Sequence, residues 1–284
     1  MRSTRMAAVV AGVVMMAGLT ACNGGKSDNA GGSGGSDGGA GSGQSPLQVA
    51  LASLKTAAQQ TGGKKSAEVD GTLKNATSTQ SMKGAMDWSQ GMRMNLDITQ
   101  SAGMMAGKPM KAVYTSDAMY MNLGTPMGGK SWVKYDYDAL AKKMGPAGAL
   151  IKDQMNNNNP TRAMELLIAS GKVKEAGKED VRGVQATHYT GTLSISELTR
   201  MQSKNISESD MKALEQQLKQ SGAGQEAIDL WIGSDNLLVK KREQLVGGKV
   251  PYDSTVFYSH YGTKVPDQVP AAGDTVDFDK VGKP

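Results

Sequence analysis

The chain has 284 residues, 38% of them hydrophobic, a formal net charge of +5 and one cysteine. That length allows one sizeable domain with a packed core, and a single cysteine excludes a fold held by intramolecular disulfides. The mild charge argues against an exported nucleic-acid binder. Basic residues are interspersed with Asp and Glu, so we interpret short basic runs such as Lys240-Lys241-Arg242 as solvated surface. Contact with anionic lipid headgroups is the alternative.

The first 21 residues have the three parts of a secretory signal peptide. Arg2 and Arg5 give the basic start, residues 6–19 form an apolar run, and small residues follow. The apolar run is about 14 residues long, whereas a helix that crosses a bilayer needs roughly 20. We therefore expect residues 1–21 to be removed as a signal peptide.

This segment ends in Leu19-Thr20-Ala21-Cys22, which resembles a bacterial lipobox. The resemblance implies that the chain is cut before Cys22 and that the Cys22 thiol is diacylated. It also implies that lipid anchors the new N-terminus on the extracytoplasmic face of the cell membrane. A plain signal peptide that contains a cysteine by chance is the alternative.

Residues 22–45 are predicted to be the lipidated cysteine and a flexible tether. After Cys22 the segment consists almost wholly of Gly, Ser, Asn, Asp and Ala, so it lacks the large apolar side chains that a packed structure needs. A Gly/Ser-rich chain of roughly 23 residues has an r.m.s. reach of roughly 25–30 Å. The folded domain is expected to comprise residues 46–284.

From residue 69 to residue 133 the apolar residues recur with a period of two. This alternation is typical of strands that bury one face, and Gly, Pro and Asp residues mark the turns between them. The predicted strands cover residues 69–73, 82–88, 92–98, 111–115, 119–123 and 132–133.

Helices then interrupt the strands. Apolar residues within 137–144 have helical spacing. Asn159-Pro160 is typical of an N-cap followed by a proline in the first turn, and Gly171 is expected to end that helix. Ser194-Ile195-Ser196-Glu197 has the form of a capping box, and a further helix is predicted over residues 207–222.

The remaining strands are predicted over residues 172–178, 184–193, 227–232, 237–246, 255–261 and 275–278. This order of strands, helices and strands predicts an α+β fold. We expect a curled antiparallel sheet, or half-barrel, of about ten strands, because large sheets tend to curl. Helices are expected to cover its concave face.

Three segments of the C-terminal half resemble motifs of the LppX/LprG group of actinobacterial lipoproteins, which are similar in fold to the LolA and LolB lipoprotein carriers. They are residues 183–189 (GVQATHY), 229–237 (DLWIGSDNL) and 258–265 (YSHYGTKV). The resemblance covers residues 46–284. It implies a membrane-tethered protein that binds acyl chains of a lipid or glycolipid in an apolar cavity, for transfer across the cell envelope. A membrane transporter is a further partner that such a role allows.

Apolar residues of the strands and helices are the expected lining of this cavity. The candidate lining residues are Met86, Met94, Leu96, Ile98, Met121, Met164, Leu167 and Ile168. The chain has 19 methionines and 2 phenylalanines, and flexible Met side chains suit a pocket for varied acyl chains. Ordinary core packing is one alternative, and Cu(I) binding by Met92-x-Met94 and Met119-x-Met121 is another.

The sequence contains no motif that predicts a catalytic, metal or cofactor site. His188 and His260 fall on predicted strands, where a structural role is expected. A Ser-His-Asp site stays open at this point, although no Gly-x-Ser-x-Gly elbow is present, and spacings typical of zinc ligands are missing. We therefore expect a non-enzymatic lipid-binding lipoprotein without cofactors. The alternative is a sensor or scaffold lipoprotein that binds a membrane or envelope protein.

Overall fold

The computed structural model describes residues 45–144, 159–202, 224–247 and 251–281, together with positions 208, 212 and 216. The first part of the chain contains α1 (Pro46–Lys64), β1 (Ser66–Asn75), β2 (Thr79–Asp87), β3 (Arg93–Gln100), β4 (Met110–Tyr114), β5 (Ala118–Asn122) and β6 (Trp132–Asp136). The later elements are α2 (Tyr137–Met144), α4 (Arg162–Ser170), β7 (Lys174–Val181), β8 (Val184–Ser194), α5 (Ile195–Gln202), β9 (Gln225–Gly233), β10 (Leu238–Val246), β11 (Tyr252–Ser259), η1 (Ala272–Asp274), β12 (Thr275–Asp277) and η2 (Phe278–Lys280).

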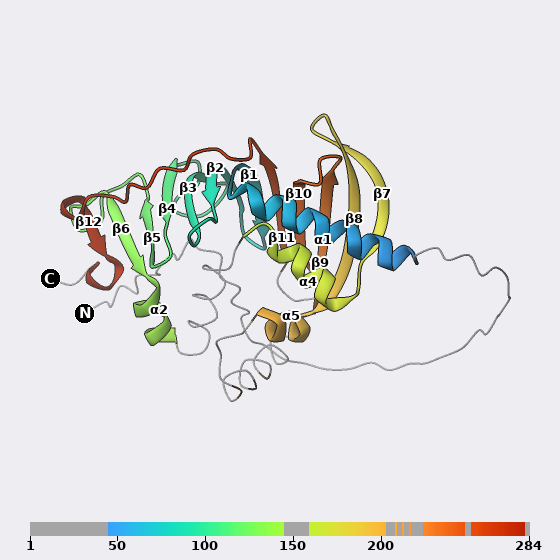
Figure 1. Ribbon diagram of the computed structural model, residues 1–284. Coiled ribbons are helices and arrows are strands. Elements are labelled where there is room, and N and C mark those ends of the chain that lie inside the picture. The colour runs from blue at the N-terminus through green and yellow to red at the C-terminus, as the bar shows by residue number, and fades with distance from the viewer. Residues whose placement is uncertain are drawn as a thin grey trace, which may run out of the picture.

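The strands form one curled, unclosed sheet (Figure 1). Its twelve described strands have the order β12-β6-β5-β4-β3-β2-β1-β11-β10-β9-β8-β7. β1 pairs with both β2 and β11, so it joins the meander β1–β6 to the C-terminal strands. The predicted α+β fold with a large antiparallel sheet is confirmed, with twelve strands where about ten were expected.

The far edge of the sheet differs from the prediction. β12 pairs with β6 in parallel, with Thr275 opposite Trp132. The reason is the path of the chain after β11, which runs back along the sheet to its distant edge (Figure 1). Strands that are joined by such a long return are free to pair in the same direction, whereas a short hairpin forces the antiparallel arrangement.

The helix α1 is absent from the sequence prediction. It begins with a capping box in which the Ser45 hydroxyl accepts a hydrogen bond from the Gln48 N–H (3.3 Å). In return, Oε1 of Gln48 accepts one from the Ser45 N–H (2.9 Å), and Pro46 occupies the first helical position. One face of α1 is buried and consists of Ala50, Leu54, Ala57 and Thr61, so α1 packs into the core.

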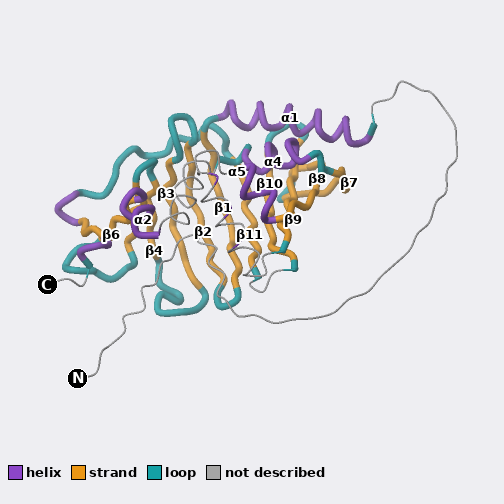
Figure 2. The backbone as a smooth tube through the Cα atoms, turned by 90° about the horizontal axis from the view of Figure 1, so that it is seen from below, coloured by secondary structure: helices purple, strands orange, loops and turns teal. Residues whose placement is uncertain are grey.

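The helices lie on one face of the sheet. α1 and α4 lie over the half formed by β7–β11, with α5 beside β8, whereas α2 adjoins β6 at the other end (Figures 1 and 2). The predicted capping box of α5 is confirmed by reciprocal bonds between Ser194 and Glu197. Gly171 ends α4 in a left-handed conformation (φ 63°), as predicted. Of the helix predicted over residues 207–222, the structure describes positions 208, 212 and 216, and the other residues lie outside the described part of the chain.

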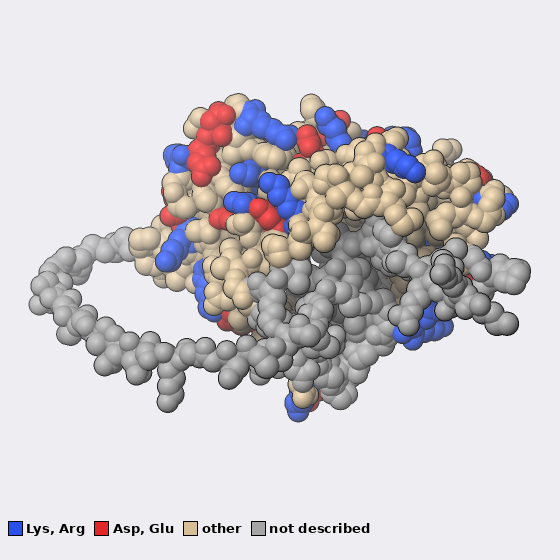
Figure 3. Space-filling model, turned by 180° about the vertical axis from the view of Figure 1, so that it is seen from behind, with Lys and Arg blue, Asp and Glu red and all other residues tan. Residues whose placement is uncertain are grey.

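Two apolar clusters occupy opposite faces of the sheet. The larger cluster includes Leu96, Leu167 and Ile228 and joins the helices to the sheet face that they cover, which we call the inner face. The smaller cluster contains Val181, Ala186 and Trp231 on the outer face. The view from behind in Figure 3 has Lys/Arg and Asp/Glu side chains interspersed over the surface.

Candidate functional site

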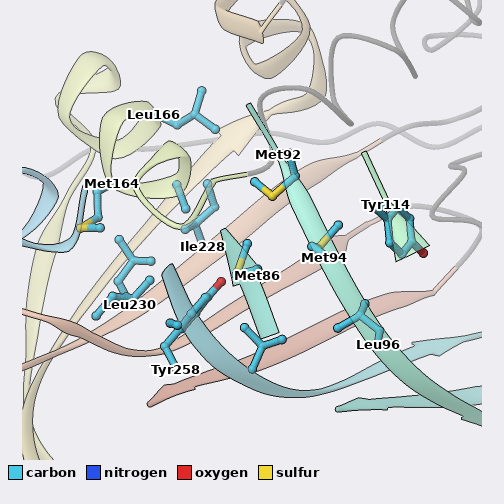
Figure 4. Packing of buried hydrophobic residues seen from close by; sticks show 14 of the residues in the cluster. Met86, Met92, Met94, Leu96, Tyr114, Met164, Leu166, Ile228, Leu230 and Tyr258 are labelled. Atoms are coloured by element: carbon cyan, nitrogen blue, oxygen red, sulfur yellow. The ribbon is translucent and has the colours of Figure 1, made fainter. Parts of the chain in front are cut away.

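Apolar side chains form three rows across the inner face of strands β2–β5. Neighbours within a row are opposed residues of adjacent strands, whose side chains interact directly. The rows are Met86-Met94-Tyr114-Met119, Leu96-Ala112-Met121 and Ile98-Met110. Every one of these residues is buried. Figure 4 shows Met86, Met94, Leu96 and Tyr114 together on this part of the sheet.

The helix α4 brings further apolar residues to the other half of the inner face. Met164 and Leu167 are fully buried, and Ile168 is partly buried against the same cluster. This close approach depends on Gly191 of β8. A Cβ atom at Gly191 would lie 2.1 Å from the carbonyl oxygen of Lys172 and 2.6 Å from Cδ2 of Leu167. In Figure 4, Met164 and Leu166 lie near Ile228 and Leu230 of β9.

Seven of the eight candidate lining residues belong to the large apolar cluster, and Ile168 packs against it. Five come from β2, β3 and β5, and three come from α4. Seven are buried, and Ile168 is the partly buried member. The structure therefore brings them into one connected interior, while their role as a cavity lining stays a prediction.

A polar cluster on the same inner face is absent from the sequence prediction. Nζ of Lys241 lies 2.9 Å from the Glu243 carboxylate, and these side chains are 9% and 18% exposed. Glu226 is 8% exposed. Glu243 is opposite Ile228 in the register, so Glu226, two residues earlier on β9, is its diagonal neighbour on the inner face. Tyr252 of β11 completes the group. Burial raises the pKa of its hydroxyl, and Glu243 and Glu226 raise that pKa further.

The electrostatics of this cluster follow from its burial. Burial, reinforced by the Glu243 charge, raises the pKa of Glu226 to about 8. Burial opposes the charged form of Lys241, but Glu243 and the hydroxyls of Tyr258 and Tyr252 outweigh it and raise the pKa of Lys241. At neutral pH the cluster therefore holds a Lys241–Glu243 ion pair beside a protonated Glu226.

The interpretation of Lys240-Lys241-Arg242 as a solvated run is wrong for its central residue. Lys241 is 8% exposed, because successive strand residues face opposite sides of the sheet. The signal that could have revealed this is Glu243, which follows Lys241 by two residues and therefore shares its face.

The opposite end of the inner face carries a second polar atom in apolar surroundings. Tyr137, the first residue of α2, is 3% exposed. Its hydroxyl is one of the buried side-chain atoms in the described ranges that have no hydrogen-bond partner. Burial and the neighbouring Tyr114 raise the pKa of Tyr137, so this phenol stays protonated.

Cys22 and its lipobox, Leu19, Thr20 and Ala21, lie outside the described residues. Among the helices that are described, none has the length and hydropathy of a membrane span. Within the same residues, no group of three or more His, Cys, Asp or Glu is arranged to hold a metal ion.

The fold and this interior define an α+β protein with a curled sheet whose inner face is apolar. Two Streptomyces proteins are similar to it in sequence. The "Uncharacterized 31.2 kDa protein in rplA-rplJ intergenic region" of Streptomyces griseus is 41% identical over 247 residues, 82% of this chain and 80% of that protein. "Putative lipoprotein SCO4650" of Streptomyces coelicolor is 31% identical over 285 residues, 93% of this chain and 90% of that protein. The chain belongs to the family of these two proteins. No family model matches it.

Two solved structures of mycobacterial proteins are also similar to this chain. LprF from Mycobacterium bovis is 18% identical, with a TM-score of 0.47, and the match covers 81% of this chain and 100% of LprF. Lipoprotein LppX of Mycobacterium tuberculosis is 12% identical, with a TM-score of 0.47, and the match covers 78% and 98%.

Proposed function

We propose that the protein is a lipid-anchored lipoprotein on the extracytoplasmic face of the cell membrane. Residues 1–21 are then its signal peptide, residues 22–45 the acylated Cys22 with its tether, and residues 46–284 the folded domain. The lipobox sequence supports this organisation, as does the lipoprotein name of the Streptomyces coelicolor relative. The capping box at Ser45 supports the boundary, because it begins α1 directly after the tether.

We propose further that the inner face binds the acyl chains of a lipid or glycolipid, for transfer across the cell envelope. The observation that carries this proposal is the continuous set of apolar rows over β2–β5, which consist largely of methionine. Flexible thioether side chains adapt to chains of different shape. Each methylene group buried contributes about 0.8 kcal/mol, so long acyl chains bind tightly with little polar recognition.

The positions of the two histidines support a role without catalysis. His188 stacks on Trp231 of the outer-face cluster. His260 has a 74% exposed side chain that pairs with Glu68 at the surface. Neither residue faces the apolar interior. The ligand and the membrane are the partners of this role, and a transporter is a further one.

Native mass spectrometry of the full-length protein, purified from an actinobacterial host in mild detergent, tests the proposal. Acyl groups on Cys22 are covalent and survive denaturation, whereas a bound lipid is lost. The difference between native and denatured masses therefore separates the ligand from the anchor. We expect a species with two or more acyl chains in near-stoichiometric amount. Equal masses, with no gain when lipids are offered, would contradict the carrier role and favour the sensor or scaffold alternative.

A pair of adjacent substitutions on β4 adds a structural control. Ala112 is buried in the middle apolar row, whereas its neighbour Val113 is on the opposite face and half-buried. We expect Ala112→Trp to fold and to lose bound lipid, because the indole fills the space that an acyl chain takes. Val113→Trp should retain the lipid. An Ala112→Trp protein that unfolds while Val113→Trp is stable would indicate a filled core.

A further inference from the structure

Three buried side-chain atoms of the described residues have no hydrogen-bond partner: Oδ1 of Asn95, the hydroxyl of Tyr137 and Nε1 of Trp231. Asn95 lies between two residues of β3 whose side chains are on the inner face, so its own side chain is on the outer face. Trp231 belongs to the outer-face cluster. Tyr137 is the member of this set that packs in the large apolar cluster of the inner face, where it is 3% exposed.

We propose that the Tyr137 hydroxyl donates a hydrogen bond to the carbonyl oxygen of an ester or amide group at the end of a bound acyl chain. This inference rests on the acyl-binding function proposed above, and it names the chemical group that links the chain to the rest of the ligand. A buried donor without an acceptor costs free energy. A ligand that supplies the acceptor removes this cost when it binds.

The first support is the position of the hydroxyl at one end of an apolar row. The row that contains Tyr114 and Met119 continues to Tyr135 of β6, which is opposite Met119 in the register. Tyr137 follows Tyr135 by two residues and begins α2. Tyr114 is near enough to raise the pKa of Tyr137. An acyl chain along this row therefore has a single polar donor at its end, which is how a few polar groups orient a ligand in an apolar site.

The second support is the fixed backbone at Tyr137. Its N–H donates to the carbonyl oxygen of Asp117 at 3.0 Å, in the turn between β4 and β5. The Asp136 carboxylate accepts a hydrogen bond from the Ala139 N–H (3.0 Å) and so caps the first turn of α2. Because both bonds hold the backbone that carries the phenol, its hydroxyl is a preorganised donor.

The absence of charge on the phenols selects a neutral acceptor. Burial and Tyr114 raise the pKa of Tyr137, and burial raises the pKa of Tyr114 to about 12, so both hydroxyls are neutral at pH 7. Lys134 and Asp136 pair with each other on the alternate residues of β6, which face outward. A phosphate or carboxylate beside Tyr137 would lose its hydration against neutral groups, whereas a carbonyl oxygen has much less hydration to lose. An ester- or amide-linked acyl chain carries such an oxygen.

Two lipids with chains of the same length test the acceptor. Dipalmitoylglycerol has an ester carbonyl on each chain, whereas dihexadecylglycerol has ether links and no carbonyl group. They compete at equal concentration for the full-length protein, delipidated in detergent, and native mass spectrometry measures the occupancies. We expect a preference of about fivefold for the ester lipid, which is the effect of one neutral hydrogen bond.

Infrared spectroscopy gives a direct measurement of the same bond. Dipalmitoylglycerol with carbon-13 at both carbonyl groups separates the lipid bands from those of the protein. A hydrogen bond to an ester carbonyl lowers its stretching frequency, so the complex should show one shifted ester band. The shift should be missing from the complex of Tyr137→Phe.

Two variants locate the effect. Tyr137→Phe removes one oxygen atom, so it should abolish the ester preference while dihexadecylglycerol binds as before. The same variant should be more stable than the wild type without lipid, because the unpaired hydroxyl is gone. A hydroxyl with a purely structural role would not combine these two effects. Tyr120→Phe is the control, since Tyr120 lies between the buried Met119 and Met121 of β5 and faces the other side of the sheet.

Each result decides the proposal. Equal binding of the two lipids, with no shifted ester band, overturns the carbonyl assignment and leaves the acyl-binding function standing. A preference that persists in Tyr137→Phe, or that is lost equally in Tyr120→Phe, also overturns the assignment. Binding of neither lipid overturns the acyl-binding function, and the carbonyl assignment with it.

Discussion

The imidazole ring of His188 stacks on the indole of Trp231, with ring centroids 4.3 Å apart and 8° between the ring planes. Both ring nitrogens of His188 also face carboxylates, Nδ1 at 3.1 Å from Glu179 and Nε2 at 2.8 Å from Asp229. Nζ of Lys240 lies 3.6 Å from the centroid of the Trp231 ring. Side chains from β7, β8, β9 and β10 therefore converge on one indole at the outer face.

His188→Ala should destabilise the protein by about 1–3 kcal/mol, because it removes the stacked ring and leaves the part-buried Asp229 without this partner. Urea unfolding followed by circular dichroism measures the loss. His260→Asn is the control, since His260 is 74% exposed and its positive φ of 45° suits asparagine. Equal effects of the two substitutions would contradict the special role of the stacked histidine.

Glu226 should make stability depend on pH. Burial raises its pKa from an ordinary 4.5 to about 8, so between these values the folded state holds a proton that the unfolded chain has released. The free energy of unfolding therefore falls as pH rises through this window and levels off above it. Glu226→Gln has no carboxyl group to titrate. Its free energy of unfolding should therefore exceed that of the wild type by up to a few kcal/mol between about pH 5 and pH 9. Parallel pH profiles from urea unfolding would refute the assignment.

Gly191 and Gly63 should respond oppositely to a methyl group. Gly191→Ala places Cβ 2.1 Å from the Lys172 carbonyl oxygen, so α4 must move away from β8, at a cost of about 1–3 kcal/mol. Gly63 lies within α1 and has open space around the added atom. Gly63→Ala should stabilise the protein by about 0.5–1 kcal/mol. Thermal unfolding of both variants checks the signs, and a neutral Gly191→Ala would show that the close approach is not required.

Two tyrosine hydroxyls should also have opposite effects on stability. The Tyr137 hydroxyl is buried without a partner among the described atoms, so Tyr137→Phe should raise the free energy of unfolding by about 1 kcal/mol. The Tyr261 hydroxyl donates to the carbonyl oxygen of Leu238 at 2.6 Å. Tyr261→Phe should lower the free energy of unfolding by about 1–3 kcal/mol. Chemical denaturation of the two variants compares them, and a destabilised Tyr137→Phe would indicate an unrecognised partner.

Local patterns predict much of the secondary structure. The alternation of β3 and β4, the helix over residues 137–144 and the capping box at Ser194 all depend on residues close in sequence, and each is found. The helix α1 has a weak pattern, because its buried face includes Ala50 and Ala57 with Leu54. Small side chains contribute little to a periodic hydrophobic signal.

Features that depend on distant residues are harder to predict. The pairing of β1 with β11 joins Val69 to Tyr258, and no local pattern specifies which strand covers a given edge. The burial of Lys241 depends on the register of β10 against β9. Sequence reasoning therefore identifies residues of the apolar interior, whose lining role stays a prediction, but it does not find the polar cluster beside them.

The sheet order has a consequence for the newly made chain. Strands β1–β6 form a meander of local hairpins, which can pair as soon as they emerge. The free hydrogen-bonding edge of β1 is paired with β11, and the free edge of β6 is paired with β12. Both covering strands come from residues 252–281. Until that final stretch arrives, the meander has two unpaired sides open to association with other chains, so premature termination should yield aggregates in place of a shorter soluble domain.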